Sequence, residues 1–383
     1  MRDLENVKRV VIKIGSSSLV NSDLSVNENN INSLLKAFSN LRKNNIECAL
    51  VTSGAIALGM HELKLDKKPK NMSLKQACAA VGQAKLMESY NKIAEKYGLI
   101  LGQILISHDD FQFRKRMLIL SDTLDSMFKN NIIPIINEND AIAIDEIKVG
   151  DNDSLAALIS PMVCADLLIL FSDIDGLYDN KPKIYKDAKL IKEVKKIDDV
   201  ILKMVSGSSS SVGTGGMETK IDAAISSMLA GINMIICNST RIDDLIDIIN
   251  GKEIGTLFKK YDNAISKRDH WIIFKSNSSG NIYVDNGLEN TLKEKKVSIL
   301  PKGIKKVEGE FLSGAIVNII SLDGEILAKG ISNYSSSEIK QIIGLETDLL
   351  ASELGYIGKK QVIHANDLVL LKEGYYGHFV KKM

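Results

Sequence analysis

Short runs of apolar residues alternate with longer segments of helical period over the first two-thirds of the chain. The apolar runs occupy residues 10–14, 49–52, 99–106, 132–136, 167–171 and 232–237. The segments of helical period occupy residues 28–43, 73–96, 115–130, 154–164 and 219–230. Predominantly apolar runs of this length are typical of parallel strands that are buried on both faces. The pattern therefore predicts an α/β fold, a three-layer αβα sandwich around a mainly parallel sheet.

The pattern changes after about residue 258. Residues 259–268 are polar and charged, and the segments beyond them are short and strand-like, with a hairpin signal at 322–325 and a helical stretch near 335–354. Short strands separated by turn signals are typical of a mainly β domain. We therefore expect a second, smaller, mainly β domain after the α/β domain.

Charge and cysteine content exclude several classes of protein. The 383 residues carry 49 Lys and Arg against 48 Asp and Glu, a formal net charge of +1. Such a balance provides no broad basic field for nucleic acid or an anionic membrane. The four cysteines form no C-x-x-C pair, and no stretch of about 18 uninterrupted apolar residues occurs. We expect a cytoplasmic protein without a signal peptide, a membrane span or a disulfide framework.

Small and polar residues follow four of the predicted strands: GSSS, SGA, NEND and SDIDG. Ligands bind outside the carboxyl ends of the strands in open α/β sheets, so these loops should meet in one crevice. Lys13 stands near the end of the first strand beside bare backbone N–H groups, which suits a phosphate, although a lysine on an edge strand can simply point to water. Ser53 suits either an anion site or a plain helix cap. The run at 213–220 joins a glycine-rich loop to a helix whose first turn carries Lys220.

The segments NEND and GDNDSLAAL are denser in polar groups. Asn137, Asp140 and Asn152 offer carboxylate and amide groups that suit the ammonium group of a small zwitterion. Asp151 and Asp153 could orient lysines or the water on a metal ion, and Asp-rich turns and helix caps are the alternative. The chain lacks a P-loop and the protein-kinase signatures, and its histidines stand apart from carboxylates at ligand spacing. The residues therefore indicate phosphate and carboxylate chemistry rather than histidine chemistry.

Seven sequence blocks follow one another along the chain: VIKIGSSSL, LVTSGAIALG, QACAAVGQ, NIIPIINENDA, EIKVGDNDSLAAL, SDIDGLY and GTGGMETK. Through them the chain resembles the amino-acid kinase family, and within it the branch that phosphorylates L-glutamate. The main departures are Ser16 and Ser172, where the family often has threonine, and both keep the hydroxyl group. The segment that follows resembles the PUA domain. The resemblance implies a catalytic domain at 1–258, a linker at 259–277, a PUA-like domain at 278–358 and a C-terminal tail at 359–383.

The resemblance also implies an activity and the residues that carry it. The γ-phosphoryl group of ATP would pass to the side-chain carboxylate of L-glutamate, the first step of proline biosynthesis, with Mg²⁺ as cofactor and proline as feedback inhibitor. Lys13 and Lys220 would be catalytic, and Asp153 would position them. ATP would be bound by Lys13, Ser172, Asp173, Thr214, Gly215, Gly216, Met217, Glu218, Thr219 and Lys220. L-glutamate would be bound by Ser53, Asn137, Asp140 and Asn152, and no motif assigns a protein ligand to the metal.

Partners and alternatives follow from the same resemblance. It implies a homo-oligomer, either a dimer or a tetramer, and contact with glutamyl phosphate reductase. A relative with this fold could instead phosphorylate aspartate, carbamate, acetylglutamate or a nucleoside monophosphate, but the NENDA and GDND segments favour an amino-acid pocket. RNA binding by the second domain is a further alternative. Residues 278–358 carry eight lysines and no arginine against eleven acidic residues, a net charge of −3, so we expect neither nucleic acid nor a membrane as partner.

Overall fold

The chain forms two compact units, Met1–Ala264 and Ile265–Met383. The computed structural model describes residues 1–4, 6–107, 110–111, 114–142, 152–180, 182, 184–185, 187–205, 216–274, 278–356 and 358–371. The first unit is α/β and the second is mainly β, so the predicted fold class is confirmed.

An eight-stranded sheet forms the centre of the first unit, in the order β3-β4-β2-β1-β5-β7-β8-β6. Its strands are β1 (Arg9–Ile14), β2 (Glu47–Val51), β3 (Ile100–Ile106), β4 (Ile132–Glu138), β5 (Leu167–Ser172), β6 (Glu193–Val194), β7 (Asn233–Asn238) and β8 (Thr256–Phe258). Neighbouring strands are parallel except β7 and β8, which are antiparallel. The six predicted strands are all present. β6 and β8 were not predicted because strands of two and three residues leave no clear apolar run.

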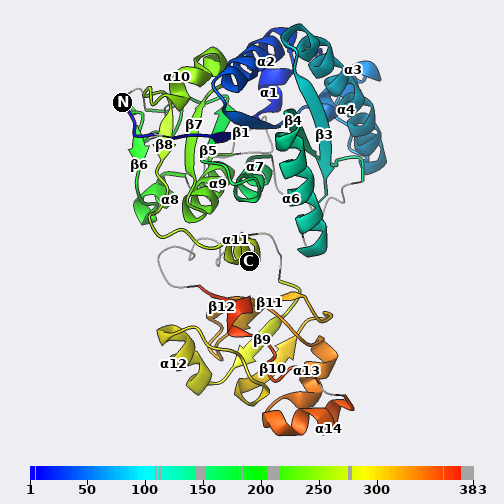
Figure 1. Cartoon of the computed structure of the whole chain (residues 1–383), viewed down its shortest axis with the longest axis vertical. Helices are drawn as coiled ribbons and strands as arrows, with labels where there is room; N and C mark the ends of the chain where they lie inside the picture. Colours follow the sequence, from blue (N-terminus) through cyan, green and yellow to red (C-terminus); the bar gives the residue numbers. More distant parts are fainter. Residues whose placement is uncertain are drawn as a thin grey trace. The chain divides into compact units, whose positions relative to one another are not determined.

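Helices cover both faces of this sheet (Figure 1). One layer contains α2 (Glu28–Lys43), α4 (Met72–Ala94) and α10 (Leu245–Ile249). The other contains α6 (Arg114–Lys129), α7 (Asn152–Met162), α8 (Asp199–Val205) and α9 (Met217–Leu229). Two short helices, α1 (Ser16–Leu19) and α3 (Ala55–Glu62), follow β1 and β2 directly. The five predicted helices are therefore found, together with shorter ones that the pattern did not reveal.

Alternate residues of β1 face different helix layers. Val10, Ile12 and Ile14 belong to the apolar core that also contains residues of α2 and α4. Successive side chains of a strand point to opposite faces of the sheet, so Lys13 faces the layer that contains α7 and α9. The alternation of side chains along β1 thus places Lys13 on the face of the sheet that α7 and α9 cover.

The helices α3 and α4 pack backbone against backbone. A Cβ atom at Gly82 of α4 would lie 1.8 Å from the carbonyl oxygen of Ala55, and one at Gly59 of α3 would lie 1.8 Å from that of Cys78. Both distances are far below van der Waals contact, so a larger residue would force the helices apart. The crossing fixes α4 against the beginning of α3, and with it the position of the next residue, Gln83.

The second unit is built on a five-stranded sheet in the order β10-β9-β11-β12-β13. Its strands are β9 (Asn281–Val284), β10 (Ile304–Glu308), β11 (Ile316–Ile320), β12 (Ile326–Ile331) and β13 (Leu368–Leu370), and its helices are α11 (Lys267–Phe274), α12 (Asn286–Glu294), α13 (Ser336–Ile342) and α14 (Leu350–Leu354). The predicted hairpin turn at 322–325 joins β11 and β12. The predicted helical stretch at 335–354 is instead two helices, because Gly344 between them adopts a φ of +78°.

The division between the units differs from the expected boundaries. It falls at 264/265 rather than at 258. The helix α11, which lies inside the expected linker 259–277, buries His270 and Trp271 and packs on β12 and β13. The strand β13, which lies inside the expected tail 359–383, pairs antiparallel with β12. Both segments are parts of the second unit: β13 contributes Leu368 to its apolar core, and α11 packs on the edge of the sheet formed by β12 and β13.

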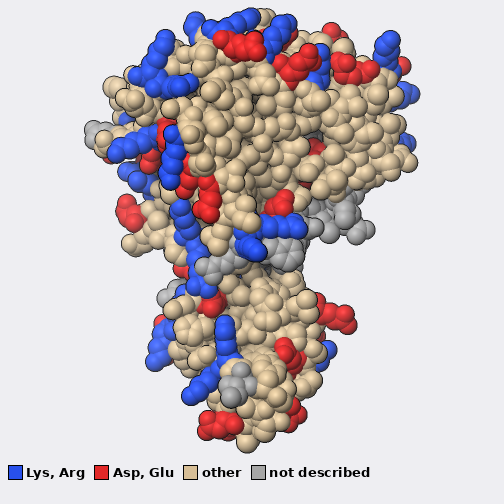
Figure 2. All heavy atoms as spheres, turned by 45° about the vertical axis from the view of Figure 1, so that its right-hand side comes forward, with Lys and Arg blue, Asp and Glu red and all other residues tan. Residues whose placement is uncertain are grey.

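Basic and acidic side chains are interspersed over the face shown in Figure 2. This distribution agrees with the near-zero net charge of the sequence. In the part of the chain that the structure describes, no helix is both long enough and apolar enough to cross a bilayer.

Candidate active site

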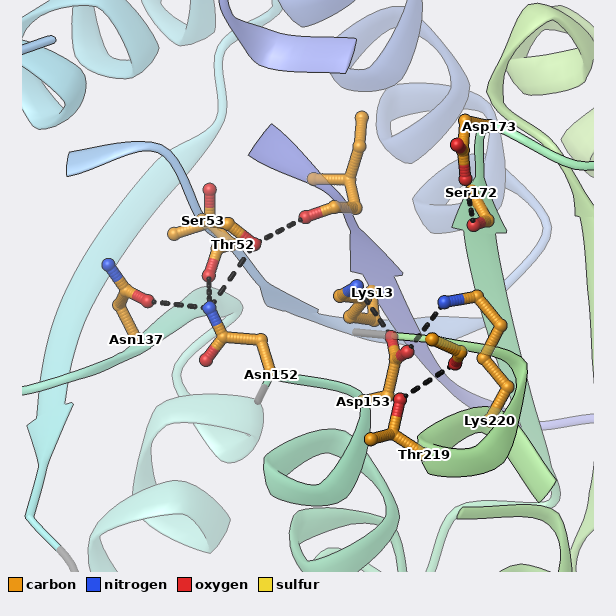
Figure 3. Close-up of polar contacts among 12 residues, drawn as sticks. Lys13, Thr52, Ser53, Asn137, Asn152, Asp153, Ser172, Asp173, Thr219 and Lys220 are labelled. Carbon is orange, nitrogen blue, oxygen red and sulfur yellow. Dashed lines mark hydrogen bonds and ion pairs between the residues drawn. The ribbon is translucent and has the colours of Figure 1, made fainter. Parts of the chain in front are cut away.

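Three charged side chains from β1, α7 and α9 meet at the carboxyl end of the sheet (Figure 3). The Nζ atom of Lys13 lies 2.5 Å from Oδ1 of Asp153, and the Nζ atom of Lys220 lies 2.9 Å from Oδ2 of the same carboxylate. All three are buried: Lys13 exposes 7% of its surface, Lys220 4% and Asp153 none. We call these three residues the lysine cluster.

The local structure explains how these residues meet. Lys13 faces the layer that contains α7 and α9, as its strand period requires. Asp153 lies in the first turn of α7, and Lys220 is the fourth residue of α9. The two helices pack against each other, so their N-terminal turns approach the end of β1 together. Helix N-termini favour anions, which makes this end of the sheet suitable for phosphate groups.

The lysine cluster carries an excess of positive charge in a buried position. Burial alone would raise the pKa of Asp153, but the ammonium groups of Lys13 and Lys220 outweigh that effect and hold the pKa below its usual value. Asp153 is therefore ionised at neutral pH. One carboxylate shared by two lysines leaves one positive charge over, and a buried unbalanced charge is costly. The arrangement is therefore suited to an anionic ligand that supplies the missing negative charge.

A second group of polar side chains begins at Asn152, the first residue of α7. Its Nδ2 donates to the carbonyl oxygen of Thr52 at 2.8 Å, to Oδ1 of Asn137 at 3.1 Å and to Oγ of Ser53 at 3.2 Å (Figure 3). The Nδ2 of Asn137 donates in turn to Oε1 of Gln83 on α4 at 2.9 Å. We call these residues the amide cluster. It brings together the loop after β2, the end of β4, the start of α7 and the middle of α4.

The residues predicted to hold ATP lie at the end of β5 and the beginning of α9. Ser172 is buried, and its Oγ donates to Oδ1 of the exposed Asp173 at 3.0 Å. Gly216 caps α9 without a side chain, and Thr219 Oγ1 donates back to its carbonyl oxygen at 2.9 Å. Because glycine leaves the first N–H groups of α9 uncovered, this helix end can receive a phosphate.

The remaining predicted residues can be placed only in part. Met217 and Glu218 lie in the first turn of α9. Asp140 lies in the turn after β4 and is half-buried. Thr214 and Gly215 lie outside the described residues.

Three groupings emerge among the predicted residues: the lysine cluster, the amide cluster with Ser53, Asn137 and Asn152, and the separate pair of Ser172 and Asp173. Their roles with substrates stay predictions. Sequence reasoning missed one member of the amide cluster, Gln83. The available signal was its position as the last residue of the QACAAVGQ block.

Comparisons with known proteins identify the family of the chain. The model of the amino acid kinase family matches residues 8–238, and that of the PUA domain matches residues 280–353. A protein of Caldanaerobacter subterraneus subsp. tengcongensis named glutamate 5-kinase is 44% identical over 96% of this chain and 98% of its own length. Proteins of the same name from Carboxydothermus hydrogenoformans and Geobacter sulfurreducens are 41% and 40% identical, each over 96% of this chain and 99% of its own length. The chain therefore belongs to the amino acid kinase family, a family of phosphotransferases, and within it to the group of the glutamate 5-kinases.

Replacing Asp153 by Asn should destabilise the first unit by about 3 kcal/mol at pH 7, because two ammonium groups would then be buried together without a counter-charge. Far-UV circular dichroism during denaturant unfolding measures the change. Trp271, the sole tryptophan, lies in the second unit, so its fluorescence reports the unfolding of that unit separately. Asp262→Asn, at an exposed position, is the control and should leave the transition unchanged.

The difference should depend on pH with a defined sign. The pKa of Asp153 is depressed in the folded protein, so the stability that its charge contributes is present above its unfolded pKa of about 3.9. That contribution is lost as the pH falls through the folded pKa. The wild-type protein and Asp153→Asn should therefore converge in stability in acid. Equal stability at pH 7, or a difference that widens in acid, would contradict the account of the lysine cluster.

Proposed function

We propose that this chain transfers the γ-phosphoryl group of ATP to the side-chain carboxylate of L-glutamate, giving γ-glutamyl phosphate and ADP. The observation that carries the proposal is the placement of the lysine cluster directly beside the amide cluster. Asp153 and Asn152 are consecutive residues, so a phosphate-binding group and an amino-acid-binding group share the first turn of one helix. Relatives that are named glutamate 5-kinase and align over nearly the whole chain support the same reaction.

Phosphoryl transfer to a carboxylate requires charge neutralisation more than proton transfer. The side-chain carboxylate of glutamate is ionised at pH 7, with a reference pKa of about 4.3, so its attack on phosphorus needs no general base. The reaction depends on in-line placement and on neutralising the charge of the transferring group and of the departing ADP. Lys13 and Lys220 are the groups suited to this task, and Asp153 holds both ammonium groups in place.

The amino-acid substrate is assigned to the amide cluster. Ser53, Asn137 and Asn152 offer hydroxyl and amide groups to the ammonium and carboxylate groups of glutamate. Asp140, in the turn after β4, is proposed to pair with the substrate ammonium. The side-chain carboxylate of the substrate would then extend toward the lysine cluster.

ATP is assigned to the N-terminal turn of α9 and to the end of β5. Gly216, Met217, Glu218, Thr219 and Lys220, with Thr214 and Gly215 before them, would hold its phosphates. The nucleotide would contact Ser172 and Asp173.

Mg²⁺ is proposed to arrive with ATP. Among the residues that the structure describes, no group of three or more His, Cys, Asp or Glu side chains is arranged to hold a metal ion. Mg²⁺ prefers oxygen ligands and often takes them from substrate phosphates and water, so the donor set here fits a metal held chiefly by the nucleotide. When bound, the metal would neutralise phosphate charge, while the protein's own contribution remains the two lysines.

The biological setting that we propose is the first step of proline biosynthesis in the cytoplasm. The product is an acyl phosphate, which hydrolyses readily, so direct contact with the glutamyl phosphate reductase that would consume it is part of the proposal. We also propose a homo-oligomer, either a dimer or a tetramer. Regulation by proline is consistent with a site built for an α-ammonium and an α-carboxylate group, because proline carries both.

The acceptor specificity tests the proposed reaction. ADP release should be measured with glutamate, aspartate, acetylglutamate and uridine monophosphate, and hydroxylamine should be added to trap an acyl phosphate. We expect glutamate to exceed every other acceptor by about 100-fold or more in kcat/KM, because buried polar groups left unpaired by the wrong acceptor reject it. ADP release without an acceptor is the background control. Preference for another acceptor, or ADP release without a trapped hydroxamate, would overturn the proposal.

Inhibition by proline tests the regulatory part. If proline occupies the amide cluster, it should raise the KM for glutamate without lowering the maximal rate, so saturating glutamate restores full activity. Pyrrolidine at the same concentration, which keeps the ring but lacks the carboxylate group, serves as the control. Inhibition that high glutamate fails to relieve would place proline at a separate site.

A further inference from the structure

Gln83 is a buried residue of α4 that has no assigned role in the reaction. It exposes 7% of its surface, although glutamine is mostly found exposed. Its Oε1 accepts from Asn137 at 2.9 Å, which makes it a member of the amide cluster. Within the described part of the chain, its Nε2 is buried and has no hydrogen-bond partner. A buried donor of this kind calls for an explanation, because proteins seldom leave one unsatisfied.

We propose that Gln83 is a positioning and specificity residue for the acceptor: it orients Asn137 and donates from Nε2 to the α-carboxylate of the bound amino acid. The inference rests on the proposed function and names a further residue of the same site. It concerns the end of the substrate that does not react.

The direction of every amide in the cluster follows from one backbone group. The carbonyl oxygen of Thr52 can only accept, so the atom of Asn152 that lies 2.8 Å from it must be the amide nitrogen. Asn137 then presents its oxygen to Asn152 at 3.1 Å, and this oxygen also accepts from the backbone N–H of Glu138 at 2.9 Å. The Nδ2 atom of Asn137 therefore points to Gln83, which must accept the hydrogen bond with its Oε1 atom.

This series of three hydrogen-bonded amides has one unpaired polar atom at each end. At one end it is the Nε2 of Gln83, a donor, and at the other it is the Oδ1 of Asn152, an acceptor; in the described structure both are buried and without a partner. An α-amino acid carries the complementary pair, a carboxylate that accepts and an ammonium that donates. The unpaired donor thus matches the α-carboxylate, and the unpaired acceptor matches the α-ammonium.

Glutamate has two carboxylates, and the position of the lysine cluster determines which of them can contact Gln83. Transfer requires the side-chain carboxylate to reach the phosphoryl group, which the two lysines attract. Asn152 adjoins this cluster through Asp153 (Figure 3). Gln83 is linked to Asn152 through Asn137. The α-carboxylate is therefore the group left for Gln83.

The packing of α4 makes this placement rigid. Gly82, the residue before Gln83, touches the backbone of Ala55 at the start of α3, where a Cβ atom would lie 1.8 Å from a carbonyl oxygen. α3 begins two residues after Ser53, a member of the amide cluster. The helix crossing thus ties the backbone of Gln83 to the same loop that supplies Ser53 and the Thr52 carbonyl.

Two variants separate a substrate contact from a packing role. Gln83→Glu keeps the oxygen that accepts from Asn137 and replaces the unpaired nitrogen with an oxygen, so it repels an α-carboxylate at nearly constant volume. Gln83→Met keeps the length of the side chain and removes both polar atoms. Asn91→Asp, an exposed amide-to-carboxylate change on the same helix, is the matched control and should behave as wild type.

Kinetics with two acceptors provide the test: L-glutamate and its α-amide, isoglutamine, which keeps the side-chain carboxylate. For Gln83→Glu we expect the KM for glutamate to rise about tenfold or more, with kcat and the KM for ATP within about threefold of wild type. With isoglutamine the KM should change by less than about threefold, because its amide can donate to the introduced carboxylate. Gln83→Met should weaken binding of glutamate and lose the discrimination between the two acceptors.

Each other outcome overturns the inference. An unchanged KM for glutamate in both variants would show that Nε2 does not meet the substrate. Equal losses with glutamate and isoglutamine in Gln83→Glu, or a parallel rise in the KM for ATP together with a lower melting temperature, would show a packing role alone. Wild-type activity separates the two levels of the argument: if the wild-type protein does not phosphorylate glutamate, the proposed function fails first and this inference falls with it.

Discussion

The carboxylate of Asp153 holds two ammonium groups that come from a strand and from a second helix, and the rest of the site depends on this contact. Lys13 reaches it because the period of β1 turns one side chain toward the layer of α7 and α9. Lys220 reaches it because α9 begins at Gly216 and packs on α7. A carboxylate with no exposed surface keeps its charge here because the nearby lysines outweigh the effect of burial, as the direction of its pKa shift indicates. The shared carboxylate therefore keeps two cations at one point with a surplus of positive charge.

The amide cluster depends on a second constraint, the backbone contact between α3 and α4. Gly59 and Gly82 allow the two helices to approach until carbonyl oxygens lie where Cβ atoms would otherwise be. This approach places Gln83 within hydrogen-bond distance of Asn137 and ties α4 to the loop after β2. Since Asn152 and Asp153 are neighbours, the two constraints meet in the first turn of α7. A reaction that joins an amino acid to a phosphoryl group requires both groups of residues to be held in one frame.

Much of this arrangement could be predicted from the sequence, because buried parallel strands and amphipathic helices leave long, regular patterns. The six strands, the five helices and the convergence of the carboxyl ends of β1, β2 and β4 followed from that pattern. The motif blocks implied Lys13, Asp153 and Lys220 and the positioning of both lysines by Asp153, but the burial of the three side chains could not be predicted, because it depends on residues far apart in the chain. The only signal for Gln83 was its place at the end of the QACAAVGQ block, and a glutamine in a helix pattern usually faces solvent. Its burial results from the glycine crossing beside it.

The second unit shows a different limit of sequence patterns. The helix α11 and the strand β13 were expected as linker and tail because residues 259–268 are polar and charged and the resemblance to the PUA domain covers only residues 278–358. Only the pairing of β13 with β12 and the packing of α11 reveal that they belong to the fold. The match of residues 280–353 to the PUA domain names a fold but not a partner. The net negative charge of this segment disfavours binding to the phosphate backbone of a nucleic acid.

The maximal rate of Lys13→Met and of Lys220→Met, at saturating glutamate and ATP, tests the central claim most directly. Each variant keeps one lysine to pair with Asp153, so no buried charge is left alone and the fold should persist. If the paired lysines neutralise the departing phosphoryl group, each substitution should lower kcat about 100-fold while changing the KM for glutamate little. A near wild-type kcat in either variant, with an unchanged circular dichroism spectrum, would show that the lysine cluster is structural and would contradict the account.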